Sequence, residues 1–246
     1  MSCCPTDVIP DTDKKTYEPK GKFVTEPQVA YITGSGPRPI LFIPDIFGYH
    51  SYTVETADKL AAAGFTVYFP DFFDGKPWSV DDLPPHDGFD GARFQGFIQP
   101  LMYTDAMQAK LKVAIGECQK AAKGNASTVV GCVGFCWGSK IALHLNGDGL
   151  VGATALPHPS FIGPEPASKA KAKCLLMPSK DDSAMEDTKA ALEAAGALGG
   201  YKFFDDVHHG WLAARAKPNE ELFSTRREEG LAMMAEFFAT NVAAVE

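Results

Sequence analysis

Short apolar runs alternate with amphipathic stretches along most of this chain. Pro39–Pro44 and Phe65–Pro70 are continuous apolar segments that begin or end at proline. Such runs are typical of strands that are buried on both faces of a sheet. Between them, Ser51 is placed to cap a helix that runs to Ala63, and Gly64 is placed to end it.

The same alternation continues to the end of the chain. Further strands are expected at Ser127–Phe135, Val151–Leu156, Lys173–Pro178 and Tyr201–Asp205. Helices are expected from Thr104 or Asp105 to just before Gly124, and at Trp137–Leu145, Ala184–Leu198 and Glu220–Asn241. This order predicts an α/β fold with a mainly parallel central sheet and helices on both faces. In such folds the chemistry is found at the carboxyl ends of the strands.

The size of the chain suits one domain. It has 246 residues, of which 45% are hydrophobic, enough for a single full core. We expect an extended N-terminal arm over residues 1–22 and a single α/β domain over residues 23–246. Within it, Asp71–Pro100 is rich in Gly, Pro, Asp and aromatic residues, which predicts an irregular excursion with short helices that serves as a lid or pocket wall.

Charge and cysteine content narrow the partners and the compartment. The formal net charge is −8, which disfavours nucleic acid and anionic membranes as partners. We find no apolar run of membrane-spanning length, no secretory h-region and no glycine for myristoylation at position 2, so a cytoplasmic protein is expected. The six sparse cysteines fit a reducing compartment. For Cys3 and Cys4 a frayed terminus, palmitoylation and a redox role all stay open.

The strongest chemical signal is the segment Gly134–Gly138, of sequence GFCWG. It follows an expected strand and opens an expected helix, as does the nucleophile elbow G-x-Nu-x-G, here with Cys136 as the nucleophile. The helix N-terminus favours a thiolate and an oxyanion, and the backbone N–H of Trp137 is a candidate oxyanion donor. The alternative is an ordinary strand-to-helix turn around a buried cysteine.

A base and an acid follow in the order that this fold uses. His209 lies in a loop after a late strand and precedes a glycine, with His208 as its rival. Asp181 follows the strand expected at Lys173–Pro178 and is chosen as the acid that orients the imidazole, whereas Asp182 is the alternative as a helix cap.

The loop after the first buried strand completes the expected site. In this fold it supplies the second oxyanion N–H, which we assign to Ile46. Asp45 then lies close to the nucleophile and can influence the thiol, or is simply a turn residue.

Together these segments resemble the dienelactone hydrolase family (carboxymethylenebutenolidase-like), in its eukaryotic, fungal-type branch. The resemblance runs from about Pro39 to Phe238. It rests on D-I-F-G at 45–48, P-D-F-F at 70–73, G-F-C-W-G-S at 134–139, the acid at 181 and H-G-W…R at 209–215. It implies an α/β-hydrolase that opens lactones or activated esters through a Cys-His-Asp triad and a thioester.

The resemblance also suggests roles for residues around the triad. Asp45 stands where bacterial members have a glutamate that restrains the thiol. Arg215 and Arg93 are candidates to bind a substrate carboxylate, and His158 either lines the pocket or is structural.

The expected partner is a small lactone or ester, handled by a monomer or homodimer. The sequence shows no phosphate loop, no dinucleotide fingerprint and no clustered metal ligands, so neither a cofactor nor a metal is expected. Two other hypotheses remain: a ligand-binding or thiol-redox sensor built around Cys136 on the same fold, and a pure interaction protein.

Overall fold

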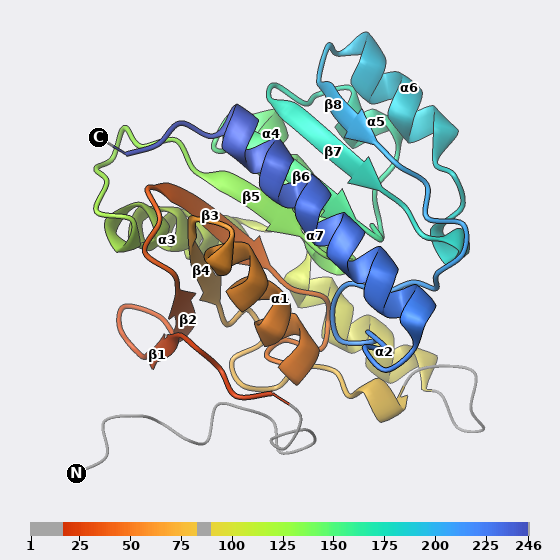
Figure 1. Cartoon of the computed structure of the whole chain (residues 1–246), viewed down its shortest axis with the longest axis horizontal. Helices are drawn as coiled ribbons and strands as arrows, with labels where there is room; N and C mark the ends of the chain where they lie inside the picture. The colour runs from red at the N-terminus through yellow and green to blue at the C-terminus, as the bar shows by residue number, and fades with distance from the viewer. Residues whose placement is uncertain (1–16, 83–89, 246) are drawn as a thin grey trace.

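An eight-stranded sheet forms the centre of the molecule (Figure 1). The computed structural model describes residues 17–82 and 90–245. The strand order is β1-β2-β4-β3-β5-β6-β7-β8. Strand β2 (Ala30–Thr33) pairs antiparallel with the edge strand β1 (Lys22–Val24) on one side and with β4 on the other. The remaining strands are parallel: β3 (Arg38–Ile43), β4 (Phe65–Pro70), β5 (Gly131–Gly134), β6 (Ala153–Pro157), β7 (Lys173–Met177) and β8 (Leu198–Tyr201).

Helices cover both faces of this sheet. Helices α1 (Ser51–Ala62) and α7 (Glu221–Asn241) pack against one face (Figure 1). Helices α3 (Asp105–Ala121), α4 (Trp137–Asp148) and α6 (Glu186–Ala194) pack against the other. Alternate strand residues supply the two cores, because successive side chains point to opposite faces. The remaining elements are short: α2 (Gly91–Ile98), α5 (Pro164–Ala167), η2 (Val80–Asp82), η3 (Gln99–Leu101) and η4 (Lys180–Asp182).

The predicted fold class is confirmed, and the differences are local. The last strand lies at Leu198–Tyr201 rather than Tyr201–Asp205. Because its two central residues are glycines, it lacks the apolar run by which the other strands were predicted. Gly199 fits here because a Cβ at this position would come within 2.8 Å of the Phe237 ring of α7. Helix α1 is capped by His50, whose Nδ1 accepts a hydrogen bond from the Tyr52 amide at 3.4 Å, and Ser51 is its first residue.

The end of the predicted arm packs onto the domain. The Tyr17 hydroxyl and the Lys20 amide both donate to Asp58 of α1, at 2.7 and 3.0 Å. Residues 1–16, including Cys3 and Cys4, lie outside the described residues, and the domain boundary near residue 22 stays a prediction.

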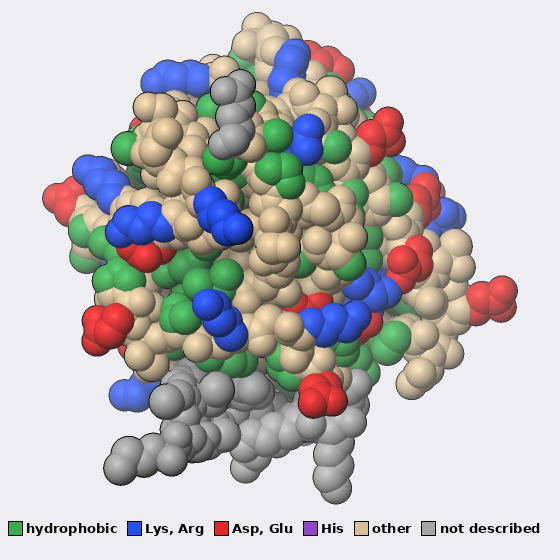
Figure 2. All heavy atoms as spheres, turned by 60° about the vertical axis from the view of Figure 1, so that its left-hand side comes forward, with side chains coloured by type: hydrophobic (Ala, Val, Ile, Leu, Met, Phe, Trp, Pro, Cys, Tyr) green, Lys and Arg blue, Asp and Glu red, His purple; other side chains and the backbone are tan. Residues whose placement is uncertain are grey.

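The surface carries both signs of charge. On the face shown in Figure 2, basic and acidic side chains are interspersed. Among the helices of the described residues, none is long and apolar enough to cross a membrane.

Candidate active site

Cys136 stands in a strained turn between β5 and α4. Its backbone angles are φ 54° and ψ −117°, a conformation that is costly for a residue with a side chain and typical of functional sites. The glycines on either side make the turn possible. A Cβ on Gly134 would lie 2.2 Å from the Gly138 carbonyl oxygen, and one on Gly138 would lie 2.5 Å from that of Ile43. The segment therefore has the backbone of a nucleophile elbow.

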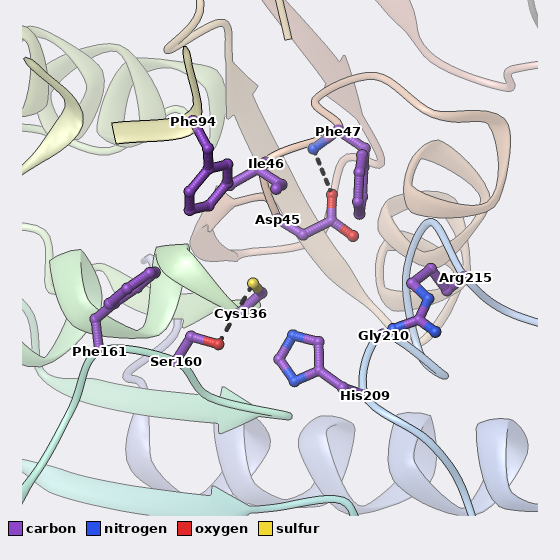
Figure 3. A pocket seen from close by; sticks show the side chains of 10 residues that line it. All are labelled: Asp45, Ile46, Phe47, Phe94, Cys136, Ser160, Phe161, His209, Gly210 and Arg215. Carbon is purple, nitrogen blue, oxygen red and sulfur yellow. Dashed lines mark hydrogen bonds between the residues drawn. The ribbon is translucent and has the colours of Figure 1, made fainter. Parts of the chain in front are cut away.

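The thiol of Cys136 is half-buried and faces a cavity (Figure 3). Its Sγ atom lies 3.6 Å from the hydroxyl oxygen of Ser160, and the Ser160 amide donates to the Cys136 carbonyl at 2.9 Å. The imidazole of His209 lies on another side of the sulfur (Figure 3). The thiol thus meets a hydroxyl and an imidazole at the N-terminus of α4.

Asp182 holds the imidazole of His209. Its Oδ1 is hydrogen-bonded to His209 Nδ1. Its Oδ2 accepts from both the amide and the hydroxyl of Ser179, at 2.8 and 2.7 Å. The Asp182 side chain is only 5% exposed. A buried carboxylate with its lone pairs used in this way fixes the orientation of the ring.

The prediction that Asp181 pairs with the imidazole is wrong. Asp181 is exposed, and its Oδ2 accepts a hydrogen bond from the backbone amide of His209 at 3.0 Å. The reason is the tight turn η4, in which Ser179 is the cap and Asp182 is the third residue, so that Asp182 points back toward the strand end. Asp182 therefore has the predicted capping contact and the contact with the ring as well.

The surroundings of His209 favour its charged form. Burial opposes a charge on this ring, but the neighbouring Cys136 sulfur and the Asp182 carboxylate outweigh burial and raise the pKa of His209 to about 10. Such an environment favours the imidazolium form of His209.

The other two histidines near the site do not face the cavity. His208 is half-buried and packs against Phe223, with the rings tilted and their centroids 4.7 Å apart, and burial lowers its pKa. His158 is fully buried, and its ring meets that of His209 edge-on at 5.0 Å. Burial and the nearby His209 hold the pKa of His158 well below its usual range. His158 lies behind His209 and is absent from the lining of the cavity. The expectation that it lines the pocket is therefore not supported, and the alternative, a structural role, remains.

The expected oxyanion donors flank the cysteine. Ile46 follows β3 and lines the cavity, and Trp137 is the first residue of α4. Within the described part of the chain, neither backbone N–H donates a hydrogen bond. Unpaired N–H groups beside a nucleophile are suited to a developing oxyanion.

The cavity has a volume of about 230 Å³. Apolar side chains dominate its wall, with Arg215 on the side opposite Phe94 and Phe161 (Figure 3). Its lining consists of Asp45, Ile46, Phe47, Phe94, Cys136, Ser160, Phe161, His209, Gly210 and Arg215. Among the ion pairs of the described residues, none involves Arg215.

Arg93 does not line the cavity. Its side chain is 58% exposed and forms an ion pair with Asp82 at 3.0 Å, while its guanidinium lies 4.5 Å from the centre of the Trp78 ring. The charge of Asp82 and the Trp78 ring hold it outside, so the expectation that it binds substrate is not supported. Its neighbour Phe94 faces the cavity instead.

From the sequence, no role was predicted for Ser160, Phe161 and Phe94 of the wall. A signal existed for the first two, because both follow the carboxyl end of β6, where site residues are expected in this fold. For Phe94 the sequence shows only that it lies in the predicted excursion.

The chain is similar in sequence to known proteins. Residues 29–242 match the model of the dienelactone hydrolase family. An uncharacterized AIM2 family protein of Schizosaccharomyces pombe is 34% identical, over 96% of this chain and 98% of its own. Dienlactone hydrolase 1 of Gibberella moniliformis is 30% identical, over 61% of this chain and 56% of its own.

A solved structure has the same fold. A dienelactone hydrolase-like promiscuous phosphotriesterase from metagenomic libraries superposes with a TM-score of 0.62. The match covers 91% of this chain and 95% of the other, at 17% identity, and at that identity it shows a shared fold alone.

Proposed function

Because the chain belongs to the dienelactone hydrolase family, we propose that it hydrolyses small lactones or activated carboxylic esters through a thioester on Cys136. In this proposal His209 is the base, and Asp182, in place of the predicted Asp181, is the acid that orients it. The proposal rests on one observation: the elbow thiol opens into the same cavity as an imidazole whose other nitrogen is held by a buried carboxylate.

The proposed reaction has two halves. The Cys136 thiolate attacks the carbonyl carbon, and the Ile46 and Trp137 amides donate to the developing oxyanion, each such donor being worth about 3 kcal/mol. The imidazolium of His209 gives its proton to the leaving oxygen, and the alcohol, or the opened end of the lactone, is released from the carbonyl. Neutral His209 then takes a proton from water, which attacks the thioester and frees the acid and the thiol.

The wall of the cavity narrows the substrate. A volume of about 230 Å³ is below the range of about 300–1,000 Å³ that is common for drug-sized ligands, so the acyl part is small. Phe47, Phe94 and Phe161 offer apolar contact, and the Arg215 guanidinium offers a partner for a carboxylate. We propose a small, flat lactone or enol ester that carries an acidic group.

Mass spectrometry tests the nucleophile. The protein is mixed with a nitrophenyl ester, quenched within the first turnover and digested, with Cys136→Ala as the matched control. An acyl adduct on Cys136 is expected, together with ester turnover that the variant lacks. Turnover without that adduct would disprove the nucleophile. Rapid alkylation of Cys136 without any turnover, over a panel of lactones and esters, would support the sensor hypothesis instead.

A further inference from the structure

Asp45 joins two loops that are far apart in the sequence. Its carboxylate is 1% exposed and lies in the wall of the cavity. Oδ1 accepts a hydrogen bond from the amide of Phe47 at 3.1 Å, within the loop that follows β3 (Figure 3). Oδ2 accepts one from the amide of Ala214, also at 3.1 Å, in the loop that follows His209.

The residues next to these two amides belong to the proposed site. Ile46, the proposed oxyanion donor, lies between Asp45 and Phe47, so the first bond closes a tight turn around it. Arg215, the cation of the cavity, directly follows Ala214. One carboxylate thus sets the direction of the Ile46 N–H and the place of the Arg215 backbone.

The same bonds argue against control of the thiol by Asp45. Each carboxylate oxygen already accepts an N–H, and in the described part of the chain the carboxylate has no hydrogen bond to Cys136. The Cys136 thiol donates a hydrogen bond to the Ser160 hydroxyl at 3.6 Å. To reach the thiol, Asp45 would have to leave two buried backbone amides without an acceptor, which is unfavourable.

Asp71 provides an internal comparison. It follows β4 in a Pro-Asp pair, as Asp45 follows β3, and it accepts from the amide two residues on, that of Phe73, at 2.8 Å. Its second oxygen, however, accepts from Gly75 in the same loop, at 2.6 Å. Both aspartates therefore close the same kind of turn within their own loop. Of the two, Asp45 alone also accepts a hydrogen bond from a distant loop.

We propose that Asp45 is a positioning residue that ties the oxyanion loop to the loop carrying Arg215, and that it does not gate the thiol. This inference rests on the proposed function for its effect on the reaction, but the link itself exists independently of any turnover. The two can therefore be tested apart.

Hydrogen–deuterium exchange tests the link. Wild type, Asp45→Ala, Asp45→Asn and the control Asp71→Ala are compared segment by segment. In Asp45→Ala exchange is expected to accelerate at least about tenfold in both 45–48 and 211–216, since a lost bond of about 1.4 kcal/mol corresponds to a factor of ten. In Asp45→Asn, whose single amide oxygen can keep only one of the two bonds, at least the 211–216 segment should accelerate. Asp71→Ala should accelerate exchange in 71–76 alone. Unchanged exchange at 211–216 in both Asp45 variants would overturn the link.

Two rates on the same proteins test the role. Alkylation of Cys136 by iodoacetamide uses the thiol but no oxyanion hole, whereas single-turnover acylation by a nitrophenyl ester uses both. In Asp45→Asn we expect acylation to fall about 10- to 100-fold, with alkylation within about twofold of wild type. Alkylation that rises severalfold would identify a gate and overturn the proposal. If wild type itself forms no acyl enzyme, the proposed function fails, and the exchange measurement still decides whether the link exists.

Discussion

The imidazole of His209 is hydrogen-bonded through Nδ1 to Asp182, while the adjacent Asp181 reaches only the His209 backbone amide, at 3.0 Å. Two neighbouring carboxylates therefore contact one histidine in different ways. One orients the ring, and the other fixes the loop that carries it.

This difference predicts unequal effects of matched substitutions. Asp182→Asn should lower kcat/KM for a nitrophenyl ester by about 10² to 10⁴, because an amide facing Nδ1 selects the wrong tautomer and gives up the imidazolium. Asp181→Asn should stay within about threefold of wild type, since an amide oxygen still accepts the backbone N–H. Equal losses in the two variants would contradict the assignment of the orienting role to Asp182 alone.

The environment of His209 predicts a high alkaline limit of activity. Free-enzyme pKa values appear in kcat/KM, and with the pKa of His209 raised to about 10 by Cys136 and Asp182 against burial, the imidazolium persists through neutral pH and is lost as pH rises through about 10. In Asp182→Asn this limb should move down by at least about one pH unit. A wild-type limb near the ordinary histidine value would contradict the ion pair.

Asp45 predicts a stability that falls with rising pH. Burial raises its pKa from 3.8 to about 6, against its two backbone hydrogen bonds and the nearby His209 and Arg215 charges. The folded protein thus favours the neutral acid, and its contribution is present below about pH 4 and lost above about pH 6. Relative to Asp45→Asn, the unfolding free energy of wild type should fall by up to about 3 kcal/mol over this range. Urea denaturation of both proteins at several pH values measures the difference; parallel curves would contradict it.

The elbow glycines predict a sharp contrast with an open glycine. Gly134→Ala should fail to fold or lose several kcal/mol, about 3 or more, because its Cβ would meet backbone at 2.2 Å. The control is Gly116→Ala in the middle of α3, where no atom lies within 4 Å of the added Cβ. It should gain up to about 1 kcal/mol from helix propensity. Thermal unfolding separates the two, and a well-folded Gly134→Ala would argue against the strained turn.

Arg215 predicts selectivity for acidic substrates. Arg215→Ala should raise KM about 10- to 100-fold for an ester bearing a free carboxylate, as expected for the loss of a charge-assisted hydrogen bond. A neutral ester of the same size should change less than about threefold. Arg93→Ala is the matched control, because that side chain pairs with Asp82 outside the cavity. A similar loss on both esters would mean that Arg215 shapes the wall rather than selects charge.

The elbow, and the order of the nucleophile, acid and base along the chain, could be predicted from the sequence because they depend on local features. A cysteine between two glycines, after an apolar run and before an amphipathic one, constrains the backbone wherever the segment lies. The sheet followed from the same alternation. The strand at Leu198–Tyr201 was missed because two of its four residues are glycines, and the ring that leaves no room for a Cβ at Gly199, that of Phe237, is distant in sequence.

What the sequence could not decide was the direction of individual side chains. Asp181 and Asp182 have the same chemistry, and only the turn that begins at Ser179 determines which of them enters the site. His158 and Arg93 were plausible pocket residues by their positions in the sequence. In the structure, however, His158 is fully buried, and Arg93 is held outside the cavity by its ion pair with Asp82. Ser160 became visible only when β6 and β5 were placed side by side.

The wide spacing of the site along one sheet has a consequence for how the protein is made. During synthesis Cys136 leaves the ribosome before Asp182 and His209, and 209 − 136 = 73 residues separate it from its proposed base. The proposed pair can therefore form only after the segment that carries His209 has been made. Until then the growing polypeptide carries Cys136 without its proposed base.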